Sequence, residues 1–417
     1  MVAIANVKIW SHNIGVILWD EMQQLGIFEF DKNFLKLGLD IFPVLMPLSE
    51  LKKGKLVFSF PTLSLETFKG LPGLLSDSLP DNFGNLIIEA WLTNKGKEST
   101  YFSPVDKLCL IANNGVGALE YEAFEIQKTK ISTEIELQEL INFVNETLNN
   151  KVNSVIDNTD FFNMTIVLAG ENPKVNVGYN PKTDKFSTNN SEYSEGFESW
   201  IIKLDGINNF ENTDSKIEYA YYLMALDCGI KMSESKLIEQ NNRSHFMTKR
   251  FDRLNNQKIH MQTLCGLAHL DYKNTGFYSY EQAFQVLREL KLTYSDSEEL
   301  YRRMVFNVMS RNQEDHTKNI SFLMFPDGKW QLSPAYDLTY SNNLNTNLHQ
   351  MSINKKTENI LLKDLLAVAK SINIKKPRKI IEQCNEILFN WDIYGQKAGL
   401  STNQIRQIER ELIIYDL

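Results

Sequence analysis

Residues 311–338 constrain the fold of this 417-residue chain more than any other stretch. A loop rich in acidic, amide and imidazole groups precedes a short apolar run at residues 320–325. Residues 326–328 read Pro-Asp-Gly, which predicts a tight turn, and an alternating stretch follows at residues 329–332. The pattern predicts a β-hairpin that returns the chain and brings Asp337 back beside the polar loop.

Three polar residues of this stretch have a spacing suited to phosphoryl transfer. Glu314 and Asn319 stand five residues apart, and Asp337 follows the predicted hairpin. Transfer from ATP depends mainly on placement, with a carboxylate near the acceptor hydroxyl and hard oxygen ligands on Mg²⁺. Protein kinases arrange a catalytic acid, an Asn five residues later and a second metal-binding Asp in this way. From spacing alone, an ordinary polar loop joined to a hairpin is the alternative.

Five motifs follow one another along the chain. They are residues 78–84 (SLPDNFG), 115–121 (GVGALEY), 249–253 (KRFDR), 263–282, and 312–319 with 333–338. In this order they resemble the HipA family, the serine/threonine-kinase toxins of bacterial type II toxin–antitoxin systems. Five matches in the family's order are far more specific than any one of them.

The resemblance implies an α+β, two-lobed, kinase-like fold. Residues 1–122 would form a β-rich N-terminal subdomain, and residues 123–250 a small ATP-binding lobe. Residues 251–417 would form a largely helical C-terminal lobe carrying the catalytic loop and the metal site. Hydrophobic periodicity in the last part agrees with this expectation. It predicts helices at residues 280–290, 297–309, 360–371, 377–389 and 402–413.

The resemblance also assigns roles to single residues. Asn319 and Asp337 are expected to hold Mg²⁺, and Lys203 to clamp the phosphates of ATP. Backbone groups near Lys249 and Phe251 are expected to meet the adenine edge. Lys203 interrupts a short apolar strand, and a lysine there is costly unless its ammonium meets an anion. An edge-strand lysine that reaches water is the alternative.

A turn in the first half of the chain resembles the family's phosphate-covering turn. The backbone amides of Gly170, Glu171 and Asn172 and the side chain of Lys174 would face ATP phosphate oxygens. By itself the turn is a weak signal, because a single Gly before polar residues also suits a loop between strands. The family's autophosphorylated serine is replaced here by Val167, so we expect no switching by phosphorylation at that position.

One departure from the family bears on activity. Glu314 stands where the family has its catalytic Asp, and Asp315 follows it. Glutamate carries the carboxylate one methylene further, and a misplacement of about 1 Å can cost ~10²-fold in rate. Glu314 acting from a retracted backbone, Asp315 acting in its place, and nucleotide binding with little transfer all remain open. We expect His316 to fix the loop's shape by a hydrogen bond to a backbone carbonyl rather than to transfer a proton.

Composition and charge indicate the protein's location and the kinds of partner it has. A net charge of −8 argues against a protein that coats nucleic acid, although basic residues gather at 375–379. The N-terminus does not resemble a secretory signal, and no apolar run approaches the ~20 residues that span a membrane. We therefore expect a cytoplasmic protein with no membrane partner. The four scattered cysteines are expected to be reduced, buried thiols.

The resemblance finally implies a reaction and partners. The chain would transfer the ATP γ-phosphate to a Ser or Thr of a translation-related protein, for example an aminoacyl-tRNA synthetase. A cognate helix-turn-helix antitoxin would control it and bind operator DNA. Two alternatives are a nucleotide-binding pseudokinase acting as scaffold or co-repressor, and a small-molecule phosphotransferase, since a fold does not dictate a substrate.

Overall fold

The computed structural model describes most of the chain and divides it into two compact units. The described residues are 4–94, 96, 102–123, 134–148, 164–165, 173–188, 195–205, 214–255, 257–341 and 347–417. Unit 1 comprises Met1–Asn212, Ile238–Gln262 and Leu323–Lys329, and unit 2 comprises Thr213–Leu237, Thr263–Phe322 and Trp330–Leu417. The three-domain division expected from the sequence stays a prediction.

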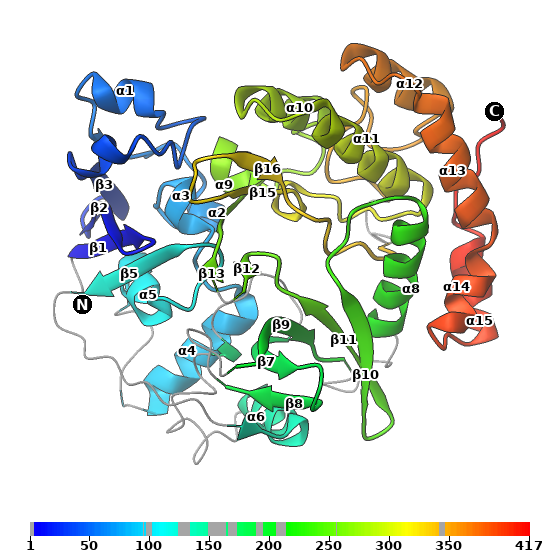
Figure 1. Ribbon diagram of the computed structural model, residues 1–417, viewed down its shortest axis with the longest axis horizontal. Coiled ribbons are helices and arrows are strands. Elements are labelled where there is room, and N and C mark those ends of the chain that lie inside the picture. The colour runs from blue at the N-terminus through cyan, green and yellow to red at the C-terminus, as the bar shows by residue number, and fades with distance from the viewer. Residues whose placement is uncertain are drawn as a thin grey trace. The chain divides into compact units, whose positions relative to one another are not determined.

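Unit 1 begins with an antiparallel five-stranded sheet in the order β4-β3-β2-β1-β5 (Figure 1). Its strands alternate buried and more exposed residues, as expected for a sheet with one face against a core. The predicted β-rich N-terminal region therefore contains strands, but it also contains several helices. The strands are β1 (Ile4–Ile9), β2 (His12–Asp20), β3 (Leu25–Phe30), β4 (Val57–Phe58) and β5 (Leu119–Ala123), and the helices are η1 (Phe34–Leu37), α1 (Leu48–Lys52), α2 (Leu65–Phe68), α3 (Gly73–Ser76), α4 (Asn82–Asn94) and α5 (Pro104–Ile111).

A second sheet has six strands in the order β10-β11-β9-β7-β8-β6. β9 lies between β11 and β7 and pairs antiparallel with both. The short strands β12 (Arg253–Leu254) and β13 (Gln257–Lys258) pair after it, and β14 (His260–Thr263) follows. The six strands are β6 (Glu134–Ile135), β7 (Lys174–Asn180), β8 (Lys185–Ser187), β9 (Glu198–Lys203), β10 (Ser235–Gln240) and β11 (Arg243–Lys249).

Helix α6 (Leu137–Leu148) packs against one face of the second sheet. Its apolar residues recur at helical spacing, and Leu140, Ile141 and Val144 join a core with Trp200 and Met247 of the sheet. The apolar spacing in the sequence predicts a helix over residues 133–148, and this prediction is wrong at its start. Residues 134–135 instead pair with β8 as strand β6, so the helix begins after them.

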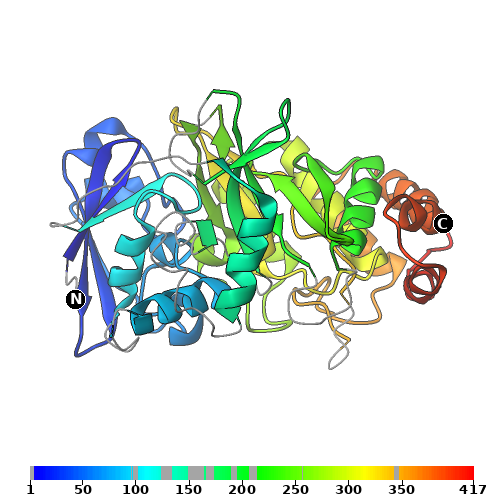
Figure 2. The ribbon, with the colours of Figure 1, turned by 90° about the horizontal axis from the view of Figure 1, so that it is seen from below.

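Unit 2 is mainly helical. Tyr221 of α8 makes edge-to-face contacts with Phe306 of α11 and Trp391 of α14, with ring centroids 6.0 and 5.7 Å apart. Figure 2 shows the last helices, in orange to red, gathered near the C-terminus. The helices are α8 (Asp214–Asp227), α9 (Leu264–Ala268), α10 (Tyr280–Glu289), α11 (Tyr294–Met309), η3 (Thr317–Asn319), α12 (Leu362–Ser371), α13 (Pro377–Phe389), α14 (Trp391–Lys397) and α15 (Thr402–Glu409).

The predicted hairpin forms from β15 (Ser321–Met324) and β16 (Trp330–Leu332). The Gly328 amide donates to the Phe325 carbonyl at 2.8 Å, and Gly328 adopts φ +80°. Glycine tolerates this left-handed conformation because it has no Cβ. Past the hairpin, the Ser333 amide donates to the Ser321 carbonyl at 2.9 Å, so the chain returns beside its starting point.

Side-chain burial agrees with the expectations from composition. All four cysteines are buried. Within the described part of the chain, no helix combines the length and the apolar character needed to cross a bilayer.

Candidate active site

The polar loop begins where α11 ends, and unit 2 fixes this point from two sides. Tyr221 of α8 donates its hydroxyl to the carbonyl of Ser310. The Gln313 amide donates to the Ser341 carbonyl at 3.1 Å, and the Ser341 amide donates to the Arg311 carbonyl at 3.2 Å. The loop therefore starts as a strand-like pair with the segment that follows Asp337.

Within the loop, Asn319 is held by Glu314. The Asn319 side-chain amide nitrogen donates to the Glu314 carbonyl at 2.9 Å. This bond uses the nitrogen end of the amide and leaves Oδ1, a hard oxygen donor, at the other end. The Glu314 side chain is exposed. Its carboxylate is thus accessible while its backbone organises the Asn319 side chain.

Tyr336 connects the two predicted metal ligands through their neighbours. Its hydroxyl donates to the Lys318 carbonyl at 2.6 Å, so the residue before Asp337 bonds the residue before Asn319. Asp337 itself has φ +57°, a left-handed conformation that is uncommon for a side chain other than glycine. Such strain persists where the surroundings enforce it, and it is frequent at functional sites. Sequence spacing alone did not single out Tyr336.

Asp315 has a different environment from Glu314. It is 3% exposed. Its Oδ2 accepts from the Tyr280 hydroxyl at 2.9 Å and lies 3.0 Å from His349 Nδ1, and its Oδ1 accepts from the Gln350 amide at 2.9 Å. A carboxylate whose two oxygens have three protein partners is held in place by the surrounding structure. These partners lie about 35 residues away in both directions along the chain, so no local pattern predicted them.

The hydrogen bonds extend beyond Asp315. The Asn307 side chain donates to the Tyr280 hydroxyl at 3.0 Å, and the Asn312 side chain donates to Asn307 Oδ1 at 3.0 Å. The chain of bonds therefore runs from α11 through α10 into the loop. It holds the backbone on both sides of Glu314, because Asn312 precedes that residue and Asp315 follows it.

His316 lies in the same loop. Its ring contacts Tyr272 edge-to-face with centroids 5.2 Å apart. Burial lowers the pKa of His316, and the nearby Asp337 carboxylate acts in the opposite direction and raises it. The net direction is downward, so the neutral imidazole is favoured. The structure thus places His316 near Asp337, and its expected role of shaping the loop stays a prediction.

In unit 1, the two predicted phosphate-binding lysines stand opposite each other. Lys174 on β7 pairs with Lys203 on β9, and directly opposite residues of an antiparallel pair project from the same face. Lys174 is buried, Lys203 is half-buried, and the Lys203 ammonium lies 5.8 Å from the ring centre of Phe246 on β11. The two ammonium groups therefore add positive charge to the same face of the sheet.

The residues expected at the adenine edge lie at the end of β11. Lys249 is opposite Trp200 of β9, and its ammonium pairs with Glu198 at 2.6 Å. The following amide, of Arg250, donates to the Ser199 carbonyl at 2.9 Å, which extends the pairing beyond the strand. Phe251 follows and is half-buried. Gly170, Glu171, Asn172 and Val167 lie outside the described residues.

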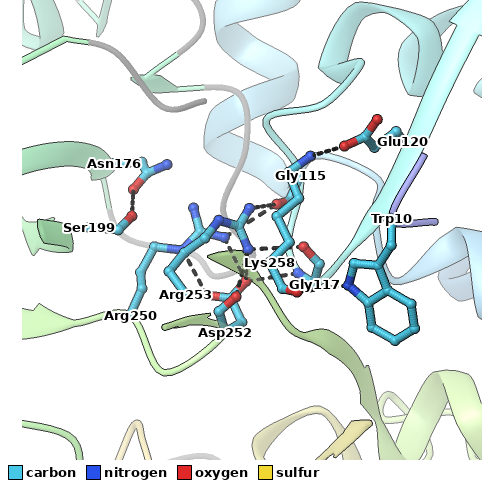
Figure 3. Close-up of polar contacts among 10 residues, drawn as sticks. All are labelled: Trp10, Gly115, Gly117, Glu120, Asn176, Ser199, Arg250, Asp252, Arg253 and Lys258. Carbon is cyan, nitrogen blue, oxygen red and sulfur yellow. Dashed lines mark hydrogen bonds and ion pairs between the residues drawn. The ribbon is translucent and has the colours of Figure 1, made fainter. Parts of the chain in front are cut away.

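A buried ionic cluster fixes the chain just beyond β11 (Figure 3). Arg250 Nη2 and Arg253 Nη1 lie 2.6 and 2.9 Å from Asp252 Oδ2, and all three side chains are at most 8% exposed. Burial alone would raise the pKa of Asp252, but the two guanidinium groups outweigh it and hold the pKa well below its usual range. The carboxylate is therefore charged and paired.

This cluster reaches the N-terminal part of unit 1. The Gly117 amide donates to Asp252 Oδ2 at 2.8 Å, and Arg253 Nη2 donates to the Gly115 carbonyl at 2.7 Å (Figure 3). Gly117 has φ +73°, and a Cβ there would lie 2.8 Å from the Met261 amide nitrogen. Residues of two sequence motifs, 115–121 and 249–253, are therefore in direct contact. The sequence did not predict this contact.

Taken separately, the two units carry features of a kinase-like protein: a lysine pair on an antiparallel sheet, and an acid–Asn loop followed by a hairpin and an Asp. A family model described as "HipA-like C-terminal domain" matches residues 166–391, more than half of the chain. A second, described as "HipA N-terminal domain", matches residues 5–122. The chain belongs to the HipA family.

One solved structure matches nearly the whole chain and supports the fold. HipA from the Shewanella oneidensis MR-1 toxin–antitoxin complex with HipB and operator DNA matches at TM-score 0.68 and 16% identity, over 98% of this chain and 95% of that one. The predicted α+β, HipA-like fold is thereby confirmed. The Helicobacter pylori proinflammatory kinase CtkA matches at TM-score 0.34 and 15% identity, over 53% of this chain and 89% of that one.

One curated relative, from Haemophilus influenzae, has the name "Putative kinase". It is 28% identical over 134 residues, which is 29% of this chain and 39% of the relative. The chain therefore matches well under half the length of this relative.

Proposed function

We propose that this chain is a HipA-type serine/threonine-protein kinase toxin that transfers the γ-phosphate of ATP to a protein in the cytoplasm. The observation that carries the proposal is the Tyr336–Lys318 hydrogen bond, because it holds the backbones of Asn319 and Asp337 together. Membership of the HipA family supports the same reaction.

Lys203 and Lys174 bind the phosphates of ATP in this proposal. Their opposed positions on one face of the sheet concentrate two positive charges where an anion is stabilising. The backbone amides of Gly170, Glu171 and Asn172 cover the phosphates, as the family resemblance implies. Lys249, at the end of β11, and Phe251, two residues beyond it, present their backbone to the adenine edge.

Asn319 and Asp337 are suited to Mg²⁺. Each offers a hard oxygen, and the hydrogen bond to Glu314 directs the amide nitrogen of Asn319 away from a ligand position. Among the described residues, no group of three or more His, Cys, Asp or Glu side chains is placed to hold a metal. A small protein ligand set fits Mg²⁺, which keeps water and phosphate oxygens in its shell. When bound, the ion would neutralise charge on the phosphate oxygens.

Glu314 serves as the acid that orients the acceptor hydroxyl. Its side chain is exposed, whereas the Asp315 carboxylate is buried and engaged by Tyr280, His349 and Gln350. Asp315 therefore acts as a positioning residue, and His316 shapes the loop beside Asp337. This assignment favours one of the three possibilities that the sequence left open.

The partners follow from the family. A cognate helix-turn-helix antitoxin binds the chain and, through itself, operator DNA; the complex of the Shewanella relative with HipB and DNA supports this. The phosphorylated protein belongs to translation, for example an aminoacyl-tRNA synthetase. Net charge −8 agrees with DNA binding through a partner rather than through the chain's own surface.

A radiolabel experiment tests the proposal. The purified chain is incubated with [γ-³²P]ATP, Mg²⁺ and an undialysed cell extract, and proteins are separated from small solutes. Label on a protein band that is released as phosphoserine or phosphothreonine supports the kinase. Label on small solutes would identify a small-molecule phosphotransferase, and ATP binding without transfer would identify a pseudokinase; either result overturns the proposal.

A further inference from the structure

A cavity of about 310 Å³ lies in unit 1 between α6 and the end of the β10–β11 hairpin. Its volume is at the lower end of the range for small-molecule sites, about 300–1,000 Å³. Gln138, Ile141 and Asn145 follow at helical spacing and so present one face of α6 to it. The lining consists of Gln138, Ile141, Asn145, Gln240, Asn241, Arg243 and His245.

This cavity is on the face of the sheet opposite Lys203. Lys203 is paired with Phe246 and lies over its ring, so these two side chains share one face. Neighbouring residues of a strand point to opposite faces, so His245 and Met247 lie on the other face. Met247 packs in the same core as Ile141 of α6, which confirms this direction. The cavity is therefore separate from the proposed phosphate site.

His245 lines the cavity and carries a ring nitrogen that has no hydrogen-bond partner among the described residues. Its side chain is 1% exposed, and Nδ1 accepts from the Asp205 backbone amide at 3.0 Å. Burial lowers the pKa of His245, which favours the neutral ring. With Nδ1 as acceptor, the ring proton is on Nε2. Nε2 is buried and has no hydrogen-bond partner among the described residues. A buried hydrogen-bond donor without a partner makes folding less favourable, unless a ligand or a water molecule accepts the hydrogen bond.

The lining combines the apolar side chain of Ile141 with polar side chains and one positive charge. Arg243 is the charged residue of the lining, and none of the described lining residues is acidic. The rim is organised by amides: Gln138 Oε1 accepts from Gln240 Nε2 at 3.2 Å and also from the Asn241 side-chain amide. The helix and the hairpin are thus joined at the mouth of the cavity.

We propose that this cavity is a second binding site, specific for a small carboxylate-bearing molecule. One carboxylate oxygen accepts from His245 Nε2, and the carboxylate charge is balanced by Arg243. The side-chain amides at the rim contact the polar body of the ligand, and Ile141 provides an apolar wall. The inference does not depend on the proposed kinase reaction, because it uses none of the residues assigned to that reaction.

Imidazole NMR of the 417-residue chain tests this site. Protein labelled with [¹⁵N]histidine is titrated separately with acetate, succinate and L-glutamate at constant ionic strength set with chloride. We expect saturable movement of the Nε2–H resonance of one histidine, assigned to His245 by its loss in His245→Gln. We also expect Arg243→Gln to weaken the binding at least about tenfold, as for loss of a charged hydrogen-bonding group.

Arg378→Gln is the matched control, because it removes the same charge at an exposed position at the start of α13. Its binding curve is expected to match that of the native chain. If His245→Gln does not fold, calorimetric titration of the native, Arg243→Gln and Arg378→Gln chains gives the same comparison. No saturable response to any of the three carboxylates, or equal binding by Arg243→Gln and the native chain, would overturn the proposal.

Discussion

Tyr280 donates its hydroxyl to the buried carboxylate of Asp315 across 2.9 Å, which gives Asp315 a different environment from that of its neighbour Glu314. The side chain of Asp315 is buried inside unit 2, whereas the side chain of Glu314 is exposed. The sequence did not distinguish between Glu314 and Asp315 as the catalytic acid. The surroundings of the two carboxylates do differ.

Asp315→Asn should destabilise the protein. An amide would turn donor hydrogens toward the Tyr280 hydroxyl or the Gln350 amide, which themselves donate to Asp315. We expect the free energy of unfolding to fall by about 1–3 kcal/mol, the cost of an unsatisfied buried group. Urea denaturation measures this. Asp392→Asn, at an exposed position, is the control and should stay within about 0.5 kcal/mol of the native chain. Equal stabilities of the two variants would contradict a structural role for Asp315.

Changes at Glu314 should affect the rate and leave stability unchanged. Glu314→Gln removes the acid and should lower phosphate transfer by about 10²-fold or more, the usual contribution of a general base. Glu314→Asp restores the family residue and should keep or raise the rate. Initial rates of labelling, together with melting temperatures, measure both effects. A collapse of rate in Glu314→Asp would show that the site is built around the longer side chain.

Lys203→Met should lose nucleotide binding without losing stability. The substitution removes one of the two positive charges on this face of the sheet, while the contact with Phe246 keeps an apolar partner. We expect a melting temperature close to the native value, but no increase when Mg²⁺ and ATP are added. Thermal unfolding with and without nucleotide measures this. An unchanged nucleotide-induced increase would remove Lys203 from the site.

Asp252→Asn should destabilise unit 1 in a pH-dependent way. The variant removes the anion that balances two buried guanidinium groups, which costs about 3–5 kcal/mol at neutral pH. Because the folded-state pKa of Asp252 is depressed, its stabilisation is complete above the unfolded pKa of about 3.9 and is lost as the pH falls below that value. The stability difference between native and variant chains should therefore shrink below about pH 4. Denaturation between pH 3 and 7 measures it, and a constant difference would contradict the assignment.

Local patterns predicted most elements of this fold but not all of their ends. α13 forms over the predicted residues 377–389, because Pro377 begins it and its apolar stripe is continuous. α15 ends at Glu409, four residues before the predicted end, so the apolar residues that follow Glu409 are not part of the helix. α14 was missed, because its seven residues are too few to establish a helical period.

The site was predictable only where its residues are close in sequence. The spacing of Glu314 and Asn319 pointed to one loop, and the structure joins them by a hydrogen bond. The bond between Asp315 and His349 spans 34 residues, and that between Gly117 and Asp252 spans 135. Contacts of this kind depend on tertiary packing, which periodicity and spacing do not encode.

Metal-dependent transfer by Asp337→Ala tests the central claim most directly. The rate of ³²P transfer from ATP is measured across a Mg²⁺ titration for the native chain, Asp337→Ala and the control Asp327→Ala. Asp327 lies in the turn of the same hairpin, where its ion pair with Lys329 is exposed. We predict that Asp337→Ala shows no Mg²⁺-dependent transfer while Asp327→Ala matches the native chain. Full activity of Asp337→Ala would contradict the assignment of Asp337 as a metal ligand.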